Sequence, residues 1–344
     1  MSEYNFRTDL ASERRDIYKQ ANKIEGQIDG IESEKEEIND KIKLERVKII
    51  NEKGMKAIGK PIGTYITIDT KDLKIAREEE IDETAKVLTK ELKNLINAHI
   101  QKQDEILIVG LGNIYVTPDS LGPKVINEID VTRHLIKYMP QYIESETREV
   151  SAISPGVLGT TGIETVEILK GIVDNVKPKL VIVIDALASR SIERINSTVQ
   201  ISDTGIVPGA GVGNTRNEIS KNTLGIPVIS LGIPTVVETA VLVSDCLDLF
   251  IGKLQDEAKS NEFLNNLKEM DNYEEIKEAL VPKDYNLIVT PKEIDDLIEN
   301  MKDVIARRYK FCNKLRGINP SLKFFVFCHR FFLKILQTLQ SLQI

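Results

Sequence analysis

Two short apolar runs, each leading toward an aspartate, constrain the fold of this chain most strongly. Ile106 to Val109 is wholly apolar and is broken by Gly110 and Gly112, and a second apolar run over 180–184 leads directly into Asp185. Such runs are typical of strands that are buried on both faces of a parallel sheet. The chain is therefore expected to build an α/β core around these two strands.

The segment after the first run predicts the start of a helix that carries Asp119. Thr117, Pro118 and Ser120 are residue types favoured at the first positions of a helix. Asp119 would then lie just past the carboxyl end of one strand and Asp185 at the end of another, the edge where ligands collect in open α/β sheets. If they share one site, one carboxyl holds a proton and the other activates water. The alternative is that Asp119 only caps a helix and Asp185 only ends a strand.

The remaining sequence alternates strand-like and helix-like segments, which predicts an α/β fold with a mainly parallel sheet flanked by helices over about 40–255. Residues 1–40 are polar and read as a solvated helix or a partly ordered leader, and 186–190 are expected to leave the sheet. Thr161 and Glu164 have the spacing of a capping box. The other expected strands are 43–49, 65–68, 150–153, 197–201 and 228–233, and the expected helices are 81–100, 120–139, 164–176, 235–254 and parts of 256–310.

Charge and cysteine content exclude several classes of protein. The net charge is −7, but 301–344 hold nine Lys or Arg and one acid, so the rest of the chain is strongly acidic. An acidic body is not expected to bind nucleic acid directly. The three cysteines show no paired spacing, which suggests a reducing compartment. The polar, mixed-charge segment 1–20 predicts no signal peptide, and charged residues interrupt the apolar tail, so no membrane span is expected.

Several motifs are weak on their own. Asp203-Thr204-Gly205 occurs in the catalytic loops of pepsin-like proteases, but those folds are all-β, so a turn is the better reading. Gly110-Leu111-Gly112 lacks the third glycine of the dinucleotide fingerprint. The segment 211–216 could form a backbone nest for an anion or line a substrate cleft. With three widely spread histidines and no cysteine pair, a zinc site is not expected.

Long motifs in family order give the chain a resemblance to the germination protease family of spore-forming bacteria. They are 51–54, 57–67, 109–113 (Val-Gly-Leu-Gly-Asn), 116–123 (Val-Thr-Pro-Asp-Ser-Leu-Gly-Pro), 154–162 (Ser-Pro-Gly-Val-Leu-Gly-Thr-Thr-Gly), 185–190 (Asp-Ala-Leu-Ala-Ser-Arg), 201–205, 211–214, 225–228 and 232–237.

The resemblance implies an atypical aspartic-type endopeptidase that degrades small acid-soluble spore proteins during germination. The two essential aspartates of the family fall on Asp119 and Asp185. The family fold resembles that of hydrogenase maturation proteases, whose nickel ligands include a second acid and a histidine. Here Ser120 follows Asp119 and no histidine follows Asp185 nearby. No metal and no other cofactor is therefore expected.

The resemblance also implies a zymogen that removes a short leader by self-cleavage. Family cleavage sites have an acid, an apolar residue, Ala, a small residue and Glu in order, and 9–13 (Asp-Leu-Ala-Ser-Glu) fit, with the cut between Asp9 and Leu10. The expected organisation is a propeptide over 1–9, a peptidase domain over 10–310 and an atypical basic, aromatic tail over 311–344. A homotetramer in the cytoplasm of the developing spore core is implied.

Further residues of the family motifs are candidates for the substrate cleft. They are Asn113, Ser154, Gly156, Arg190, Asp203, Gly211 and Asn214. Two alternatives remain. One is a non-catalytic α/β protein that holds a nucleotide or an anion in its glycine loops, and the other is a metal-dependent peptidase.

Overall fold

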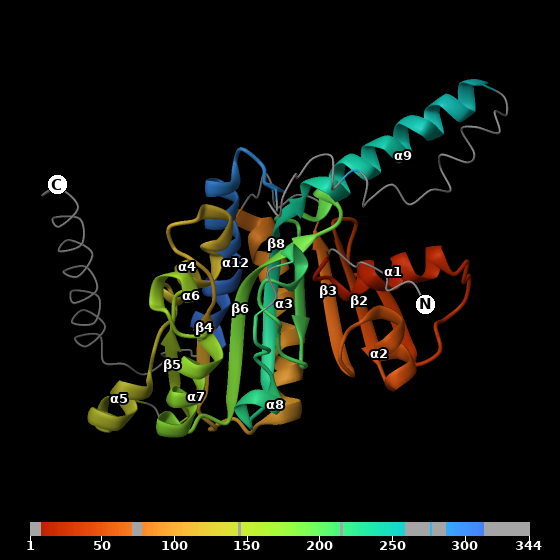
Figure 1. Cartoon of the computed structure of the whole chain (residues 1–344). Coiled ribbons are helices and arrows are strands. Elements are labelled where there is room, and N and C mark those ends of the chain that lie inside the picture. The colour runs from red at the N-terminus through yellow and green to blue at the C-terminus, as the bar shows by residue number, and fades with distance from the viewer. Residues whose placement is uncertain are drawn as a thin grey trace, which may run out of the picture.

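A computed structural model describes residues 8–70, 78–143, 146–213, 216–258, 276 and 287–312. Within these residues, one nine-stranded sheet runs through the molecule in the order β1-β2-β3-β7-β8-β6-β4-β5, with β9 paired to β8 (Figure 1). The strands are β1 (Ile31–Glu37), β2 (Ile42–Ile49), β3 (Gly63–Thr70), β4 (Ile106–Gly110), β5 (Val150–Ile153), β6 (Leu180–Ser189), β7 (Thr198–Ser202), β8 (Val228–Glu238) and β9 (Ile288–Val289).

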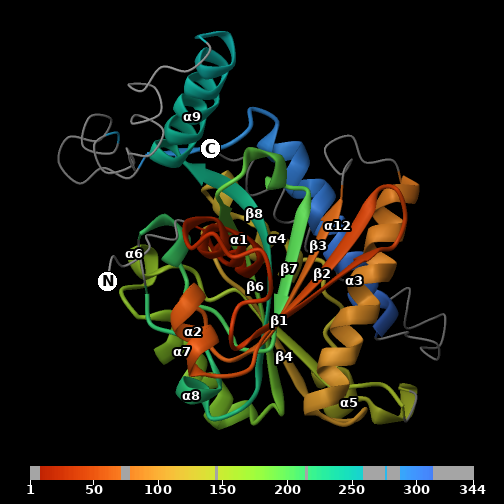
Figure 2. The same cartoon turned by 90° about the vertical axis from the view of Figure 1, so that its right-hand side faces the viewer.

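Helices cover both faces of the sheet, so the predicted α/β fold is confirmed. Figure 2 shows α3 and α12 on one side of the sheet and α1, α2, α7 and α8 on the other. The helices and short 3-10 turns are α1 (Ala11–Ala21), α2 (Glu52–Ile58), α3 (Glu78–His99), η2 (Thr117–Asp119), α4 (Leu121–Ile126), α5 (Arg133–Tyr138), η3 (Pro140–Tyr142), α6 (Leu158–Thr161), α7 (Thr165–Val176), η4 (Ile192–Arg194), η5 (Ala210–Val212), α8 (Lys221–Leu224), α9 (Thr239–Ala258) and α12 (Ile294–Cys312).

The apolar strands form the centre of the sheet, as their sequences predict. Every residue of β4 and β8 is buried, and Ile108 and Ile182 contact the core under α3 and α12, whereas Leu107 and Val181 contact the core under α7. Successive side chains of a strand point to opposite faces, so a strand covered on both sides must be apolar throughout. A third apolar cluster lies between α1, α2 and the strands β1 to β3.

The parallel part of the sheet is confined to the four strands β8, β6, β4 and β5, and the remaining pairings are antiparallel. The prediction that 186–190 leave the sheet is wrong. β6 continues to Ser189 because β8 runs beside it as far as Val237, with a shift of register after Leu187. For the same reason the next helix, α9, starts at Thr239 rather than at residue 235.

Two other local predictions need correction. The single helix expected over 120–139 is split into α4 and α5, because Thr132 bonds to the sheet edge, accepting the N–H of Val150 at 2.9 Å. Thr161 makes no capping box with Glu164; it ends α6, and its hydroxyl bonds to the carbonyl of Ile163.

The polar segment 1–40 contains a strand rather than only a leader helix. Every residue of β1 except Ile31 and Ser33 is charged, yet the strand pairs with β2 over seven residues. Ion pairs across the two strands, Lys43–Glu37 at 2.9 Å and Arg46–Glu36 at 2.9 Å, compensate for the missing apolar face.

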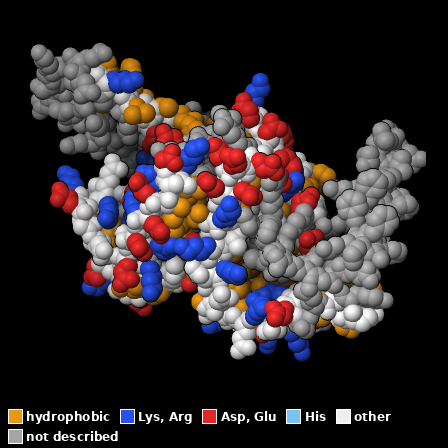
Figure 3. Space-filling view, turned by 180° about the vertical axis from the view of Figure 1, so that it is seen from behind, with side chains coloured by type: hydrophobic (Ala, Val, Ile, Leu, Met, Phe, Trp, Pro, Cys, Tyr) orange, Lys and Arg blue, Asp and Glu red, His pale blue; other side chains and the backbone are white. Residues whose placement is uncertain are grey.

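The surface is mixed in charge. On the face seen in Figure 3, acidic and basic side chains are interspersed over the described part of the molecule. α9 projects from the body in Figures 1 and 2 and carries the exposed side chains of Leu247, Leu249 and Phe250. Of the helices in the described residues, none has a stretch both long and apolar enough to span a bilayer. The predicted tail over 311–344 lies almost wholly outside the described residues.

Candidate active site

Asp119 is held at the carboxyl edge of the sheet by the tight connection between β4 and α4. It ends η2, and its Oδ2 accepts the backbone N–H of Asn113 at 2.8 Å. Gly112 allows this approach: its φ is 110°, and a Cβ there would lie 2.0 Å from the carbonyl oxygen of Asp119. The glycine pair seen in the sequence therefore brings the loop against Asp119.

Asp185 lies on the neighbouring strand, at the first position of β6 beyond the end of β4. Ile184 pairs with Gly110, the last residue of β4, and Asp185 pairs with Gly232 of β8 on its other side. Only 6% of Asp185 is exposed, and its Oδ1 accepts the N–H of Ala186 at 2.9 Å. The residue thus lies within a strand rather than at its end, but it still reaches the edge because β4 stops short.

The two aspartates line one cavity of about 470 Å³. Burial raises the pKa of the Asp185 carboxyl well above its usual range, and the nearby Asp119 and Asp9 carboxylates raise it further. Burial also raises the pKa of Asp119, against the opposing hydrogen bond from Asn113. Strongly shifted carboxyl groups in a cleft are a recurrent feature of active sites.

Asp9, the predicted cleavage residue, lines the same cavity. Its N–H donates to the carbonyl of Ala188 at 2.9 Å, and the N–H of Ala188 donates to its Oδ2 at 2.9 Å. Gly211 of η5 packs against this carboxylate, since a Cβ at Gly211 would lie 2.2 Å from the Asp9 Oδ2. Leu10 has an extended backbone and is fully buried.

The other candidate cleft residues separate into two groups. Asn113 and Gly156 line the cavity with the aspartates, and Gly211 borders it through Asp9. Ser154 is exposed and does not line the cavity, whereas Arg190 pairs with Asp245 in a neighbouring groove. Asn214 lies outside the described residues.

Asp203 belongs to the second group, in agreement with the reading of its Asp-Thr-Gly segment as a turn. Its Oδ1 accepts the N–H of Thr64 at 2.7 Å, and its Oδ2 lies 4.0 Å from Nε2 of His99. Asp203 therefore joins the end of β7 to β3 and is not among the residues that line the cavity with Asp119.

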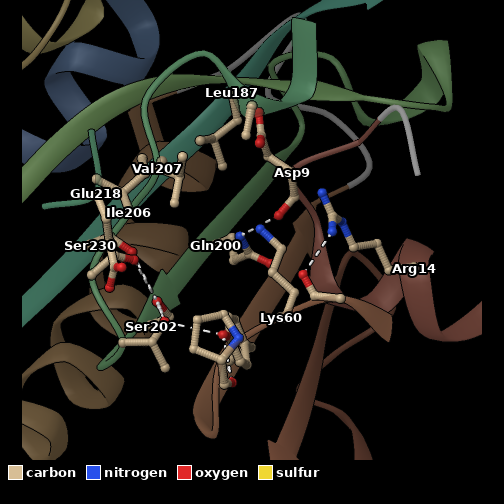
Figure 4. A pocket seen from close by; sticks show the side chains of 17 residues that line it. Asp9, Arg14, Lys60, Leu187, Gln200, Ser202, Ile206, Val207, Glu218 and Ser230 are labelled. Carbon is tan, nitrogen blue, oxygen red and sulfur yellow. Dashed lines mark hydrogen bonds between the residues drawn. The ribbon is translucent and has the colours of Figure 1, made fainter. Parts of the chain in front are cut away.

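Sequence reasoning missed one polar residue near the site. Gln200 lies in the adjoining cavity, in contact with the backbone of Asp9 (Figure 4). It had a signal in the sequence, because it is an amide between the apolar residues Val199 and Ile201 of a buried strand. Arg216, the last residue of the segment 211–216 that could line a substrate cleft, lines the cavity with the aspartates.

The described residues contain no group of three or more His, Cys, Asp and Glu side chains arranged to hold a metal ion. The fold and the site thus define an α/β protein with one buried and one half-buried carboxyl group at the carboxyl edge of its parallel strands. Carboxyl pairs with separated environments serve as acid and base in several classes of hydrolase.

Comparison with known proteins identifies the family. The family model described as germination protease matches residues 8–265 and 253–313. A germination protease of Clostridium perfringens strain SM101 is 49% identical over 324 residues, covering 93% of this chain and 96% of the relative. One of Caldanaerobacter subterraneus is 50% identical over 322 residues, covering 92% and 94%. The chain belongs to the germination protease family and is a peptidase of that family.

A solved structure of a [NiFe] hydrogenase maturation protease, HycI from Thermococcus kodakarensis, is also similar. It is 15% identical, covers 65% of this chain and 99% of its own, and has a TM-score of 0.28. This likeness is too distant to add to the description of the fold.

Proposed function

We propose that this chain is an aspartic-type endopeptidase in which Asp119 and Asp185 activate water and protonate the leaving amine. One observation carries the proposal: two carboxyl groups with raised pKa values line one cavity together with Asp9, the residue before the predicted cleavage site. General acid–base catalysis by positioned carboxyl groups contributes about 10²–10⁴-fold to a rate.

The environments of the two carboxyl groups favour different roles. Burial raises the pKa of Asp185 well above its usual range, and two other carboxylates raise it further, so Asp185 is the member of the pair that holds the proton. Asp119 accepts a hydrogen bond from the N–H of Asn113, which stabilises its ionised form. Asp119 is thus the base and Asp185 the acid.

The two carboxyl groups then accept and supply the protons that the reaction transfers. Asp119 takes a proton from a water molecule, and the water oxygen adds to the carbonyl carbon of the scissile bond. Asp185 gives its proton to the leaving nitrogen as the carbon–nitrogen bond breaks. Proton exchange between the two carboxyl groups, which lie in one cavity, restores the starting state.

The first cut would be made in the chain itself, between Asp9 and Leu10. Asp9, the last residue of this leader, lies beside β6 and is held by two hydrogen bonds with Ala188. Glu13, the last residue of the recognised segment, accepts the N–H groups of Arg190 and Ser191 at 2.9 and 3.2 Å. The segment that fits the family cleavage pattern is therefore held at both of its ends, and its first residue lines the cavity.

The substrates proposed for the processed enzyme are small acid-soluble spore proteins, cut during germination in the spore core. The family membership and the germination role in the names of the relatives support this substrate class. We further propose a homotetramer as the working form. The interspersed charges in Figure 3 suit contact with a protein rather than with nucleic acid.

The alternative of a nucleotide- or anion-binding protein gains no support from the glycine loop after β4. Gly112 packs on the carbonyl of Asp119, and the N–H of Asn113 already donates to the Asp119 carboxylate. The loop thus serves the carboxylate rather than a phosphate group.

The test is to follow the intact mass of the purified chain over time and then to add a small acid-soluble spore protein. We expect loss of residues 1–9 alone, followed by cuts in the added protein after acidic residues. A folded chain that neither shortens nor cuts the added protein would contradict the proposed function.

A further inference from the structure

A buried glutamine contacts the bond that self-cleavage would break. Gln200 lies on β7, is 7% exposed, and is flanked by the fully buried Val199 and Ile201. Burial of an amide costs free energy unless its donors and its acceptor find partners. The hydrogen-bond partners of this amide are Asp9 and Ala11, on either side of Leu10. This indicates that the amide acts on the Asp9–Leu10 bond.

The amide of Gln200 holds both sides of the Asp9–Leu10 bond. Its Nε2 donates to the carbonyl oxygen of Asp9 at 3.1 Å (Figure 4). Its Oε1 accepts the N–H of Ala11 at 2.7 Å. The bond to Ala11 fixes the amide orientation, because only the oxygen can accept from an N–H. The nitrogen must then face the carbonyl of Asp9.

We propose that Gln200 is a catalytic residue for self-cleavage: its Nε2–H stabilises the oxyanion that forms on the Asp9 carbonyl oxygen. The proposal rests on the proposed function, since it takes the Asp9–Leu10 bond as the scissile bond. A donor preorganised toward the position where negative charge develops is among the largest single contributions to peptide hydrolysis.

The step is balanced as follows. Water adds its oxygen to the carbonyl carbon of Asp9 and loses one proton to the base, Asp119. The carbonyl oxygen becomes negative while it accepts the Nε2–H of Gln200. The carbon–nitrogen bond then breaks, the electron pair leaves on the nitrogen of Leu10, and Asp185 supplies the proton that makes the new amino group.

The carboxyl pair would therefore transfer the protons, and Gln200 would stabilise the oxyanion. The carboxyl pair lines one cavity, and Gln200 lines a second cavity of about 330 Å³. Asp9 and Leu187 line both cavities. The carboxyl pair would thus activate the water molecule while Gln200, whose Nε2 donates to the Asp9 carbonyl oxygen, holds that oxygen.

Two substitutions of Gln200 distinguish the effect of its N–H donor from the effect of the rest of its side chain. Gln200→Leu removes both hydrogen bonds, whereas Gln200→Glu keeps the acceptor for Ala11 and replaces the N–H donor by a carboxyl group. The matched control is Ser202→Ala, on the same face of β7 and in the same cavity, whose hydroxyl contacts Thr204 and Ser230 but not Asp9. The rate measured is the first-order loss of residues 1–9 by intact mass.

At neutral pH, Gln200→Leu and Gln200→Glu should each slow self-cleavage by about 10²–10³-fold, the effect of removing one oxyanion donor. Ser202→Ala should change the rate less than about 3-fold, within the usual effect of a polar deletion away from the reaction. Equal rates in wild type and in both Gln200 variants would overturn the proposal.

The pH dependence distinguishes a donor from a merely structural residue. A protonated carboxyl group can donate an O–H, so the rate of Gln200→Glu relative to wild type should rise as the pH falls from 7 to 5, while the relative rate of Gln200→Leu stays flat. The other charged groups around the cavity are Asp9, Arg14, Lys60 and Glu218, and they are common to all variants. Flat ratios for both variants would reject a donor role.

Docking of the leader is checked separately, by hydrogen exchange over 8–21 in an Asp119→Asn background that cannot cut. Protection in the added Gln200→Glu variant should equal that of Asp119→Asn alone, and lost protection would mean that Gln200 only holds the leader. If wild type itself fails to lose residues 1–9, the proposed function fails. If wild type cuts and Gln200→Glu cuts equally fast, only the role of Gln200 fails.

Discussion

Asp9 and Ala188 exchange two hydrogen bonds: the N–H of Asp9 donates to the carbonyl of Ala188, and the N–H of Ala188 donates to the Asp9 carboxylate, both at 2.9 Å. Asp9 is thereby fixed against the part of β6 that extends past β4, which is also the part that begins with Asp185. The long β6 strand thus serves two purposes, since it carries one carboxyl group of the pair and holds the residue next to it.

Replacing either carboxyl group by an amide should abolish self-cleavage without unfolding the chain. Asp119→Asn and Asp185→Asn conserve side-chain volume but remove the base and the acid, so each should slow the loss of residues 1–9 by about 10²–10⁴-fold or more. Intact mass gives the rate, and circular dichroism checks the fold. Asp203→Asn is the control from the Asp-Thr-Gly segment, because Asp203 does not line the cavity. Near-normal cutting by a folded Asp119→Asn or Asp185→Asn variant would remove that residue from the mechanism.

Asp185 should make the uncut chain less stable as the pH rises. Its pKa is raised in the folded state, so its contribution to stability is full below the ordinary aspartate pKa of about 4 and is lost as the pH rises through the raised value. Asp185→Asn is neutral at every pH. Its thermal midpoint should match wild type in acid and exceed it increasingly toward pH 8, in samples whose mass still includes residues 1–9.

The control for this pH series is Asp174→Asn, an exposed residue on α7. Its thermal midpoint should differ from that of wild type by the same small amount at every pH. A constant difference for Asp185→Asn as well would show that the Asp185 carboxyl is not the source of the pH dependence.

The strands that the sequence predicted well are those whose patterns are set by burial. β4 and β5 were placed within a residue, because strands in the parallel block must be apolar where helices cover them. The expectation that Asp119 and Asp185 lie near each other followed from the same argument, since both come after apolar runs that end at one edge of a sheet.

The features that could not be predicted from the sequence depend on contacts between residues far apart in the chain. The extension of β6 past Asp185 requires β8 beside it, and the strand β1 requires ion pairs with β2 that no local pattern reveals. The contact of Gln200 with Asp9 joins residues 191 positions apart. Local propensity carries no information about such pairings, because the free energy comes from the tertiary contact itself.

Glu13 should anchor the first helix and, through it, the leader. Its side chain is 8% exposed and accepts the backbone N–H groups of Arg190 and Ser191, while Nε of Arg194 lies 3.6 Å away. Glu13→Ala leaves these partly buried donors without their acceptor and should lower the free energy of unfolding by about 1–3 kcal/mol. Urea unfolding of the uncut protein measures this.

The control for Glu13 is Glu25→Ala, an exposed acid in the turn that follows α1. Its free energy of unfolding should stay within about 0.5 kcal/mol of wild type, as for most surface substitutions. Similar losses for the two variants would mean that the contacts of Glu13 with the end of β6 contribute nothing measurable.

Gly211→Ala should disturb the position of Asp9 in the site. The added Cβ would lie 2.2 Å from the Asp9 Oδ2 and 2.8 Å from the Cβ of Ala188, so the Asp9 side chain or the loop that carries Gly211 must shift. A shift of about 1 Å in a reacting group can cost about 10²-fold in rate, and self-cleavage should slow by that order. Gly171→Ala on α7 is the matched control, because nothing lies within 4 Å of its added Cβ. Time courses of intact mass compare the two variants, and equal rates would show that the position of Asp9 against Gly211 does not govern the cut.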